Sequence, residues 1–526
     1  MRLKELIHSL DCAAAGLKDA EVEITGISSD SKEVSPGFLF VAMKGVKRDG
    51  GEFIKDAIEK GAVCVVTEKE AAGGMDDVPR IIVKDARGVI GRLSDRFYGE
   101  PSKKLKLVGV TGTNGKTTVT YLVEAIFAEA GLSGGVIGTV NYRYAGKVSA
   151  APHTTPEAPA LQRLLRDMVA SGVTHCAVEV SSHSLEQKRV DGTRFDVKVF
   201  TNLTPEHLDY HRTMEAYFNA KARFFTECAS DSSRGISIIN VDDGWGAVLQ
   251  KEVKPSLRYS MGKNADIYPT AYSITGDGIE AAVHTPRGEV SVKSPLTGEH
   301  NLYNILAAVG AACVLGIGLD CIERGVAAFK GVPGRLERVG SGTPRAYVDY
   351  AHTPDALERT LKVMTAATDI SNGGRVGRLI TVFGCGGNRD RLKRPLMGGI
   401  SAKLSDVTVL TSDNPRDEDP LDIIKEIEKG MEGVKKYAPN EPVADKGYFV
   451  IPDRAEAIKK AVEIAGRPDT ILLAGKGHED YQIIKNRRFP FDDREVLRGF
   501  LKEARGSHSS GRPAGVNGRG PNGVKK

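Results

Sequence analysis

The chain has 526 residues, of which 40% are hydrophobic and 27% charged, and its formal net charge is +5. This composition is typical of a soluble globular protein, and the length predicts three or four domains. The segment from residue 505 to the end contains no acidic residue and five basic ones: Arg505, Arg512, Arg519, Lys525 and Lys526. The rest of the chain is therefore near neutral, which argues against a nucleic-acid-binding face of clustered basic residues.

The ends of the chain and its cysteines exclude other classes of protein. Residues 506–526 are rich in Gly, Pro, Ser and Asn, so we expect a disordered basic tail. The seven cysteines include no CxxC pair, which argues against a disulfide framework and a zinc site. No signal peptide is recognisable and no apolar run is long enough to span a bilayer. We therefore expect a cytoplasmic monomer with no nucleic-acid partner and no membrane span.

Residues 1–100 form the first predicted domain, a small α/β unit. Short apolar strands are predicted at residues 39–42 and 62–66, and a helix is predicted between them at residues 53–58. The sequence Gly99-Glu100-Pro101-Ser102 reads as a linker to the next domain.

Residues 101–334 form the second predicted domain. A strand at residues 105–110 precedes a glycine-rich loop and a helix with apolar residues at helical spacing: Val119, Leu122, Val123, Ile126 and Phe127. The same period recurs at residues 161–169, before a strand at residues 176–180. Strands that alternate with helices predict a parallel sheet.

Residues 335–505 form the third predicted domain. Strands at residues 379–383, 407–410 and 471–474 are separated by helical stretches, which again predicts a parallel sheet. The predicted fold class is thus α/β with three domains: a small N-terminal α/β domain, a central phosphate-loop domain with a parallel sheet, and a Rossmann-like C-terminal domain.

The glycine-rich loop reads Gly109-Val-Thr-Gly-Thr-Asn-Gly-Lys116-Thr117-Thr118. A strand before it and an amphipathic helix after it are the context that a phosphate-binding loop requires. Backbone N–H groups and the helix N-terminus attract phosphate oxygens, Lys116 would neutralise the β- and γ-phosphates, and the Thr117 hydroxyl would ligate Mg²⁺. The loop differs from the ordinary Walker A pattern, which has glycine where this chain has Val110. A simple βα turn with an unrelated lysine would not explain why these features coincide, so ATP or GTP binding is predicted.

The chain resembles the Mur ligase family, whose variant phosphate loop reads GTNGKTT as here. The resemblance extends over about residues 25 to 500 and is greatest to the UDP-N-acetylmuramoyl-tripeptide synthetase branch. The further matching motifs occur in the family's order: Asp30-Ser31-Lys32, Pro36-Gly-Phe-Leu-Phe-Val41, Glu179-Val-Ser-Ser-His183, Asn202-Leu-Thr-Pro-Glu-His-Leu-Asp209-Tyr-His211, Glu299-His-Asn301-Leu-Tyr-Asn304-Ile-Leu-Ala-Ala308, Pro333-Gly-Arg335-Leu-Glu337 and Asp349-Tyr-Ala-His352-Thr-Pro-Asp355.

The resemblance implies an ATP-dependent ligase of peptidoglycan synthesis. In the family, ATP phosphorylates the terminal carboxylate of the substrate, and the amine of the incoming amino acid then attacks the acyl phosphate and expels phosphate. A carboxylate that attacks an anionic γ-phosphate meets strong repulsion, which metal ions and cations must offset. The implied substrates are ATP with Mg²⁺, UDP-N-acetylmuramoyl-L-Ala-D-Glu, and meso-2,6-diaminopimelate, which is added to the D-Glu carboxylate.

Catalytic and metal-binding residues follow from the matching motifs. Lys116, Glu179, His207 and Lys221 are implied as catalytic residues. Thr117 and Glu179 would hold one Mg²⁺, and Glu179, His207 and Lys221 would help to hold a second. In the family the lysine equivalent to Lys221 is carbamylated, which turns a cation into an anionic metal ligand.

The resemblance also implies residues that bind ATP, residues that bind the UDP-sugar dipeptide, and residues that bind the amino acid. His183 and His211 are assigned to none of these groups, because they could equally be structural histidines. ATP contacts are implied for Gly112, Thr113, Asn114, Gly115, Lys116, Thr117, Thr118, Asn301, Asn304, Arg335, Asp349 and His352. Contacts with the UDP-sugar dipeptide are implied for Ser29, Ser31, Val46, Lys47, Arg48, Thr154, Thr155, Ser181, Gln187 and Arg189. Gly51 departs from the branch, which often has histidine there.

The third domain should select the amino acid. Its matching residues are Arg389, Asp413, Asn414, Pro415, Arg416, Gly475 and Glu479, and the stretch DNPR is the diaminopimelate-type version of the motif. An arginine fork at Arg416 can bind the far carboxylate of diaminopimelate with two hydrogen bonds, and Glu479 can face its far ammonium. L-Lysine would leave Arg416 without an anion, near a like charge. Taken alone, DNPR could also be an Asx-Pro turn with an exposed arginine.

Rival functions make different demands on the sequence. The same ligase could use L-lysine in place of diaminopimelate. A folylpolyglutamate synthetase should lack the UDP-binding domain and the DNPR set, both of which are predicted here. A nucleotide-switch binding protein should hydrolyse nucleotide without needing an amino acid.

Overall fold

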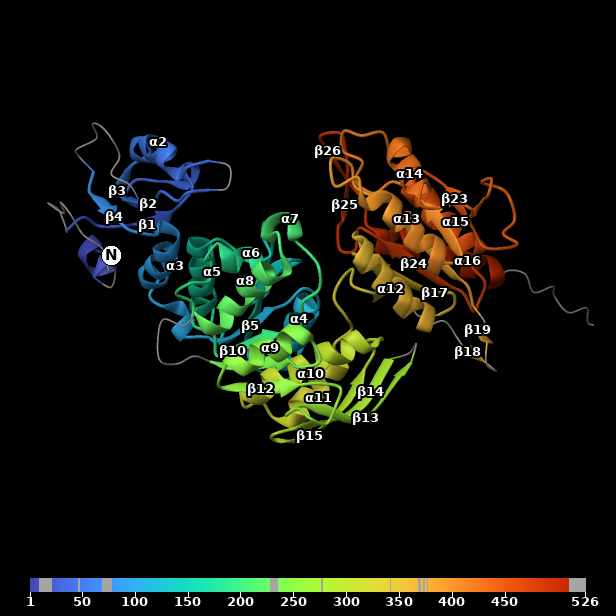
Figure 1. Ribbon diagram of the computed structural model, residues 1–526, viewed down its shortest axis with the longest axis horizontal. Helices are drawn as coiled ribbons and strands as arrows, with labels where there is room; N and C mark the ends of the chain where they lie inside the picture. The colour runs from blue at the N-terminus through green and yellow to red at the C-terminus, as the bar shows by residue number, and fades with distance from the viewer. Residues whose placement is uncertain are drawn as a thin grey trace, which may run out of the picture. The chain divides into compact units, whose positions relative to one another are not determined.

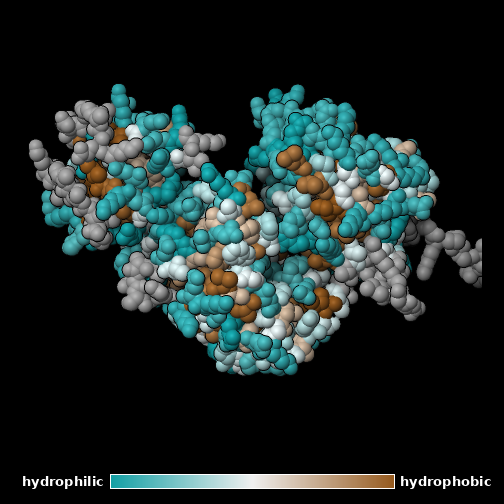
Figure 2. Space-filling model, in the orientation of Figure 1, coloured by the Kyte–Doolittle hydropathy of each residue, from teal (hydrophilic) through white to brown (hydrophobic). Residues whose placement is uncertain are grey.

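The computed structural model describes residues 1–8, 21–45, 48–68, 78–227, 235–275, 278–340, 342–367, 370–371, 374–375 and 377–509. The chain divides into two compact units, Met1–Lys330 and Gly331–Lys526 (Figure 1). On the face shown in Figure 2 the surface is mainly hydrophilic, with apolar residues in small groups. None of the helices in these described ranges is long and apolar enough to cross a membrane.

The first part of unit 1 is a four-stranded parallel sheet in the order β1-β2-β3-β4. The strands predicted at residues 39–42 and 62–66 are confirmed as β2 and β3, and the predicted helix as α2. Apolar side chains from β2, β3 and α3 fill the core of this sheet. The elements are α1 (Leu3–Ile7), β1 (Gly26–Ser28), η1 (Ser31–Glu33), β2 (Phe38–Val41), η2 (Gly50–Phe53), α2 (Ile54–Glu59), β3 (Ala62–Thr67), β4 (Arg80–Ile82), α3 (Ala86–Phe97) and η3 (Pro101–Lys103).

The rest of unit 1 is built on an eight-stranded sheet in the order β12-β11-β10-β5-β9-β6-β7-β8. The predicted parallel sheet is confirmed from β12 to β6, whereas β7 and β8 extend it as antiparallel strands. The elements are β5 (Lys106–Thr111), α4 (Lys116–Glu129), β6 (Gly134–Ile137), β7 (Asn141–Tyr144), β8 (Lys147–Ala150), α5 (Ala158–Ala170), β9 (His175–Glu179), α6 (Ser182–Glu186), β10 (Val197–Phe200), α7 (Leu208–His211), α8 (Met214–Thr226), β11 (Ile236–Asn240), α9 (Gly244–Glu252) and β12 (Ser256–Tyr259).

Unit 1 ends with a small antiparallel sheet and two helices. The sheet has the order β13-β14-β15 and was not predicted from the sequence. Helices α10 and α11 both pack against α4, which follows the phosphate loop. The elements are β13 (Tyr268–Thr275), β14 (Gly278–Thr285), β15 (Gly288–Ser294), α10 (Glu299–Val314) and α11 (Leu319–Ala328).

Unit 2 contains a seven-stranded sheet in the order β16-β17-β24-β20-β21-β23-β22, parallel except for β16. Helices α12, α13 and α14 contribute to one apolar core and α15 and α16 to another, so helices cover both faces of the sheet. This arrangement confirms the predicted Rossmann-like fold class.

The helices and strands of unit 2 are β16 (Glu337–Arg338), β17 (Arg345–Asp349), α12 (Pro354–Ala367), β18 (Ile370–Ser371), β19 (Gly374–Arg375), β20 (Leu379–Phe383), α13 (Lys393–Leu404), β21 (Val407–Leu410), α14 (Pro420–Glu428), β22 (Lys435–Lys436), β23 (Gly447–Val450), α15 (Arg454–Ile464), β24 (Thr470–Ala474), β25 (Tyr481–Ile484), β26 (Arg487–Pro490) and α16 (Asp493–Ser509). Helix α16 continues four residues beyond Arg505, into the segment that was predicted to be a disordered tail. The remainder of that predicted tail, residues 510–526, lies outside the described residues.

Candidate functional site

The phosphate loop joins the carboxyl end of β5 to the first residue of α4, as the sequence predicts. Gly112 and Gly115 have φ values of 145° and 86°, which favour glycine. A Cβ on Gly112 would lie 1.9 Å from the Thr201 hydroxyl, and one on Gly115 would lie 2.3 Å from the Asn304 side-chain oxygen. Both glycines are therefore needed for the loop to keep this path.

Lys116 folds back over the loop from the first position of α4. Its ammonium donates hydrogen bonds to the carbonyl oxygens of Gly112 (2.9 Å) and Thr113 (2.7 Å). Thr117 is next on the helix and is buried. The loop thus combines a helix N-terminus, a cation and a hydroxyl, which are the groups that a nucleotide phosphate with its metal ion requires.

The motif that begins at Asn202 supports the loop from the neighbouring strand β10. The Asn202 side-chain oxygen accepts the N–H of Asn114 at 2.9 Å, and its carbonyl accepts the N–H of Thr113 at 2.8 Å. The Thr113 hydroxyl lies 3.2 Å from the hydroxyl of Tyr217, on α8. Neither residue had an assigned role in the sequence analysis: Asn202 was quoted only as the start of a matching motif, and Tyr217 belongs to none of the quoted motifs.

Asn301 and Asn304 lie on α10, where they face the phosphate loop. The Asn304 amide donates to the Asn301 side-chain oxygen at 3.1 Å, and the Asn301 amide donates to the carbonyl of Thr297 at 2.9 Å. Both side chains are buried, and the space above Gly115 is occupied by the Asn304 oxygen. The structure therefore brings these two predicted ATP contacts to the loop.

Lys221 is a buried lysine on α8, with 1% of its surface exposed. Its side-chain nitrogen donates to the carbonyl of Gly112 at 2.8 Å and lies 4.7 Å from the centre of the Tyr217 ring. Burial, together with the nearby ammonium of Lys116, lowers the pKa of Lys221 well below its usual value. An uncharged amine is the form that reacts with carbon dioxide to give a carbamate.

Glu179, the last residue of β9, carries a fully buried carboxylate. One oxygen accepts the backbone N–H of Thr139 and the other accepts its hydroxyl, both at 2.9 Å. Within the described ranges no Lys, Arg or His forms an ion pair with this carboxylate. A buried carboxylate that has hydrogen bonds but no cation fits the donor set of a Mg²⁺ site, which typically uses one or two carboxylates plus phosphate oxygens.

The four predicted Mg²⁺ ligands would not by themselves complete the coordination of the ion. Searched over the described part of the chain, no group of three His, Cys, Asp or Glu side chains is placed to hold a metal ion. Thr117, Glu179, His207 and Lys221 are a mixed set of one hydroxyl, one carboxylate, one imidazole and one amine. This composition fits the hypothesis that phosphate oxygens and a modified lysine would complete the coordination of Mg²⁺.

Three histidines gather beside this region. The ring centres of His183 and His207 are 4.7 Å apart, and those of His183 and His211 are 5.6 Å apart. Burial is the main cause that lowers the pKa of all three, and it brings the pKa of His211 to about 4. His211 forms a 3.0 Å hydrogen bond with Ser182, which favours the structural interpretation for this residue.

A pocket of about 520 Å³ in unit 1 is lined by residues of the four-stranded sheet and by residues that belong to or follow the eight-stranded sheet. Ser28, Ser29 and Asp30 line it from the N-terminal sheet, and Tyr142 and His153 line it from the central part. Of the other predicted UDP-sugar contacts, Ser31 is buried in η1 and the Arg48 guanidinium lies 5.0 Å from the centre of the Phe53 ring. Val46 and Lys47 lie outside the described residues.

The predicted dipeptide contacts form one hydrogen-bonded network that reaches Glu179. Thr154 lies 3.1 Å from the Thr139 hydroxyl, and the Thr155 hydroxyl donates to the Glu179 carbonyl at 2.7 Å. Arg189 donates to the carbonyl of Thr155 at 3.0 Å. The remaining members are Ser181, whose N–H donates to the Thr155 hydroxyl, and Gln187, whose side-chain oxygen accepts from Arg189.

In unit 2, the carboxylate of Asp349 holds the backbone next to the predicted ATP contacts Arg335 and His352. Its carboxylate accepts the N–H groups of Leu336 (2.7 Å) and Ala351 (2.9 Å). The Arg335 guanidinium lies 4.9 Å from the centre of the Tyr350 ring, which also contacts His352. Asp349 therefore positions its neighbours within unit 2.

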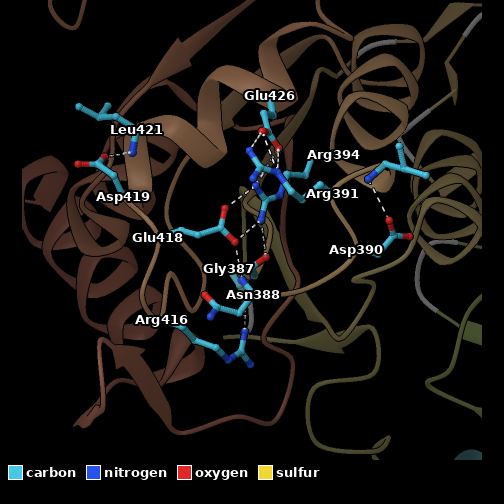
Figure 3. Close-up of polar contacts among 12 residues, drawn as sticks. Gly387, Asn388, Asp390, Arg391, Arg394, Arg416, Glu418, Asp419, Leu421 and Glu426 are labelled. Atoms are coloured by element: carbon cyan, nitrogen blue, oxygen red, sulfur yellow. Dashed lines mark hydrogen bonds and ion pairs between the residues drawn. The ribbon is translucent and has the colours of Figure 1, made fainter.

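The predicted amino-acid residues of unit 2 meet at the carboxyl ends of three adjacent strands. Loop 384–389 follows β20, the DNPR loop follows β21, and Gly475 follows β24. The strand order reverses direction at β20 and β24, which is the switch point where open α/β sheets bind ligands. Arg389 and Arg416 thus lie on the loops that follow the neighbouring strands β20 and β21. Figure 3 shows Arg416 beside Gly387 of the first of these loops.

Glu479 lies among buried polar groups. Its carboxylate accepts a hydrogen bond from the Asn414 amide at 2.8 Å and from the Lys476 ammonium at 3.3 Å. Lys476 is fully buried and also lies 3.7 Å from a carboxylate oxygen of Asp413. Burial raises the pKa of Asp413. Lys476 was missed in the sequence analysis, although it lies between the predicted residues Gly475 and Glu479.

Three family models match the chain. They are described as "Mur ligase family, catalytic domain" over residues 23–98, "Mur ligase middle domain" over residues 110–312, and "Mur ligase, glutamate ligase domain" over residues 334–477. A solved structure titled as a UDP-N-acetylmuramoyl-L-alanyl-D-glutamate--2,6-diaminopimelate ligase is similar over 96% of this chain and 99% of that one, with a TM-score of 0.70 and 32% identity.

Curated relatives resemble the chain over nearly its whole length. A protein of Geobacter sulfurreducens is 48% identical over 507 residues, covering 94% of this chain and 97% of the relative. A protein of Geobacter metallireducens is 46% identical over 513 residues, covering 96% and 99% respectively. Both are named as UDP-N-acetylmuramoyl-L-alanyl-D-glutamate--2,6-diaminopimelate ligases. Together with the geometry of the phosphate loop and of the loops that carry Arg389 and Arg416, these similarities show that the chain belongs to the Mur ligase family.

Proposed function

We propose that the protein is an ATP-dependent ligase of peptidoglycan synthesis that adds meso-2,6-diaminopimelate to the D-Glu carboxylate of UDP-N-acetylmuramoyl-L-Ala-D-Glu. The observation that carries the proposal is that unit 1 contains a complete phosphate loop and that, within unit 2, Arg389, Arg416 and Glu479 follow adjacent strands of one sheet. The chain is also similar over nearly its whole length to ligases named for this reaction. The product is a UDP-N-acetylmuramoyl tripeptide.

The first step is phosphoryl transfer to a carboxylate. A D-Glu carboxylate oxygen attacks the γ-phosphorus of ATP, the bond to the bridging oxygen breaks, and ADP leaves an acyl phosphate behind. Lys116 would neutralise charge on the β- and γ-phosphates, and the phosphate loop would hold them at the N-terminus of α4. Thr154, Thr155 and Arg189 would orient the dipeptide end, because their network reaches the buried Glu179.

The residues proposed to hold Mg²⁺ are Thr117, Glu179, His207 and Lys221. When bound, Mg²⁺ supplies positive charge that offsets the repulsion between the attacking carboxylate and the γ-phosphate. Lys221 would take part as a carbamate: its uncharged amine attacks carbon dioxide, a C–N bond forms and a proton is released. The lowered pKa and the burial of Lys221 support this modification.

The second step forms the amide bond. The amine of diaminopimelate attacks the acyl carbon, phosphate leaves with the electrons of its C–O bond, and the amine loses a proton. Arg416 would bind the far carboxylate of the amino acid, and Glu479 its far ammonium. Arg389, Asp413, Asn414, Pro415 and Gly475 would complete this binding site.

We assign one substrate to each of the three predicted domains. We assign UDP-sugar binding to residues 1–100, ATP binding to residues 101–334 and amino-acid binding to residues 335–505. The pocket lined by Ser29 and His153 supports the first assignment, because it joins the N-terminal sheet to the segment before Thr154. ATP contacts by Arg335, Asp349 and His352, and a cytoplasmic location, remain predictions.

The test is phosphate release by the purified protein with ATP, Mg²⁺ and UDP-N-acetylmuramoyl-L-Ala-D-Glu. The amino acid is meso-diaminopimelate, L-lysine or none. Of the three conditions, only the one with meso-diaminopimelate is expected to release phosphate. Phosphate release with L-lysine in its place would agree with a ligase but contradict the proposed amino-acid specificity. Equal phosphate release without any amino acid would contradict the ligase activity.

A further inference from the structure

The loops that carry Arg389 and Arg416 are packed backbone to backbone. The N–H of Gly387 donates to the carbonyl of Asn414 at 2.9 Å, and the Arg416 guanidinium donates to the carbonyl of Gly387 at 2.8 Å. A Cβ on Gly387 would lie 1.9 Å from the carbonyl oxygen of Pro415. Displacement of either loop would therefore move the arginine on the other.

A buried arginine contacts both loops from α13. Arg394 is 0% exposed, and its guanidinium donates to the two carboxylate oxygens of Glu418 at 2.8 and 2.9 Å (Figure 3). It also donates to the carbonyl of Gly386 at 3.2 Å. A buried cation is costly unless it is paired and hydrogen-bonded, and a two-point arginine–carboxylate pair fixes the orientation of both groups.

Glu418 connects this arginine to the two specificity loops. It lies two residues after Arg416, and one of its carboxylate oxygens accepts the N–H of Asn388, the residue before Arg389, at 2.5 Å. Hydrogen bonding by Arg394 is the main cause that lowers the pKa of Glu418 to about 2, so the carboxylate stays ionised at neutral pH. Arg394, Glu418 and Asn388 thus form a continuous link between the loops.

Glu426 is a second carboxylate partner of Arg394, and its substitution can serve as a control for the substitution of Glu418. The same guanidinium nitrogen of Arg394 donates to Glu426 and to Glu418, at 2.8 Å in each case. Glu426 lies on α14, and it also accepts hydrogen bonds from the Arg391 guanidinium. Among the described residues its contacts do not extend to loop 384–389 or to the DNPR loop.

We infer that Arg394 is a positioning residue for amino-acid selection, which acts through Glu418 to fix the spacing of Arg389 and Arg416. This inference rests on the proposed function, because it concerns the site for the far end of diaminopimelate. Arg394 itself is buried beneath the loops, so it would not touch the substrate. Its effect should appear in the recognition of the amino acid and not in the use of ATP.

The test compares Glu418→Gln with Glu426→Gln in the full chain. Each change removes one carboxylate charge from Arg394 while keeping the size of the side chain. Glu418→Gln should raise the KM for diaminopimelate roughly tenfold, because small displacements of a binding group are enough to cause such losses, and should leave the KM for ATP unchanged. Glu426→Gln should leave both KM values unchanged. Arg394→Lys should lie between the wild type and Glu418→Gln, since it keeps the charge and loses the two-point pair.

Equal effects of the two glutamine variants, or a fall in kcat alone, would overturn the positioning role while the proposed function stands. A wild-type protein that releases no phosphate when diaminopimelate is added would overturn the proposed function and this inference with it. Thermal unfolding of each variant shows whether the two substitutions destabilise the protein equally, so that a difference in KM cannot arise from unequal folding.

Discussion

The side-chain nitrogen of Lys221 donates a 2.8 Å hydrogen bond to the carbonyl of Gly112, the first glycine of the phosphate loop proper. A lysine that is 1% exposed thus lies against the loop that would hold the nucleotide. Its cost of burial falls if the amine is uncharged, and the lowered pKa of Lys221 reflects this. The same environment that removes the charge also prepares the amine for carbamylation.

Activity should therefore depend on carbon dioxide. Removing dissolved carbon dioxide should lower phosphate release, and adding bicarbonate should restore it. Lys221→Arg cannot form the carbamate, so it should lose activity by roughly 100-fold, a scale typical of damaged metal sites, and should not respond to bicarbonate. Mass spectrometry under mild conditions would show the added carbon dioxide on a peptide that contains Lys221. Bicarbonate-independent activity of the wild type would contradict the modification.

Thr139→Val tests whether the buried carboxylate of Glu179 is a metal ligand. The variant removes one hydrogen bond to the carboxylate, and second-shell losses of this kind typically cost 10- to 100-fold in metal affinity or activity, so about tenfold more Mg²⁺ should be needed for half-maximal activity. Thr381→Val is the matched control, because Thr381 is a fully buried threonine of unit 2 whose hydroxyl contacts Ser405. An unchanged Mg²⁺ requirement in Thr139→Val would argue against Glu179 as a ligand.

Much of the architecture was predictable because it follows from periodic apolar patterns. The strand, loop and helix around Lys116 occur as expected, and so do the alternating strands and helices of unit 2. The antiparallel strands β13 to β15 were missed. In β13 the alternation of apolar and polar residues is weak, because Ala271, Tyr272 and Ser273 are all exposed in succession. In β15 the alternation is regular, with Val290 and Val292 buried between exposed polar residues, so a signal was available there. The antiparallel strands β7 and β8, at one end of the eight-stranded sheet, were not predicted either.

Site residues that belong to a sequence motif could be predicted. Residues that support the site through contacts with partners distant in the sequence could not. Arg394 reads as an ordinary surface cation in the stretch Lys393-Arg394-Pro395, yet it is fully buried. Its partners Glu418 and Glu426 lie 24 and 32 residues further along the chain. Thr139 is likewise 40 residues from Glu179. Only the fold brings such pairs together, so one sequence alone gives no signal for them.

Arg416→Lys should weaken selection of diaminopimelate over L-lysine. Lysine keeps the charge but cannot form the two parallel hydrogen bonds of a guanidinium with a carboxylate. The preference, measured as the ratio of kcat/KM values for the two amino acids, should fall by roughly 30-fold, which corresponds to about 2 kcal/mol. Arg467→Lys is a suitable control, since Arg467 is an exposed arginine between α15 and β24 of the same unit. If Arg416→Lys left the ratio of kcat/KM values unchanged, this would contradict a role for Arg416 in selecting the amino acid.

The stability of unit 1 should fall as the pH is lowered from about 6.5 to about 4. The folded state holds His211 neutral because its pKa is lowered from 6.5 to about 4. The unfolded chain takes up a proton on this residue as the pH passes below 6.5, so acid favours unfolding across this window. Trp245, the single tryptophan, packs against Phe218 within the same unit and reports its unfolding by fluorescence.

His211→Gln should reduce this loss of stability. The urea midpoint of the variant should differ less between pH 7.5 and pH 5 than that of the wild type, although His183 and His207 contribute in the same direction. The exposed residue His284 provides the control variant His284→Gln. Equal pH dependence in the wild type and His211→Gln would contradict the neutral, buried state of His211.

The most direct test of the central claim follows the oxygen atoms of the D-Glu carboxylate. UDP-N-acetylmuramoyl-L-Ala-D-Glu is labelled with oxygen-18 in that carboxylate and turned over with ATP, Mg²⁺ and meso-diaminopimelate. An acyl phosphate transfers one carboxylate oxygen to the released phosphate, so each phosphate formed should carry the label in step with tripeptide formation. Unlabelled phosphate would mean that water and not the carboxylate attacks ATP, which would contradict the ligase account.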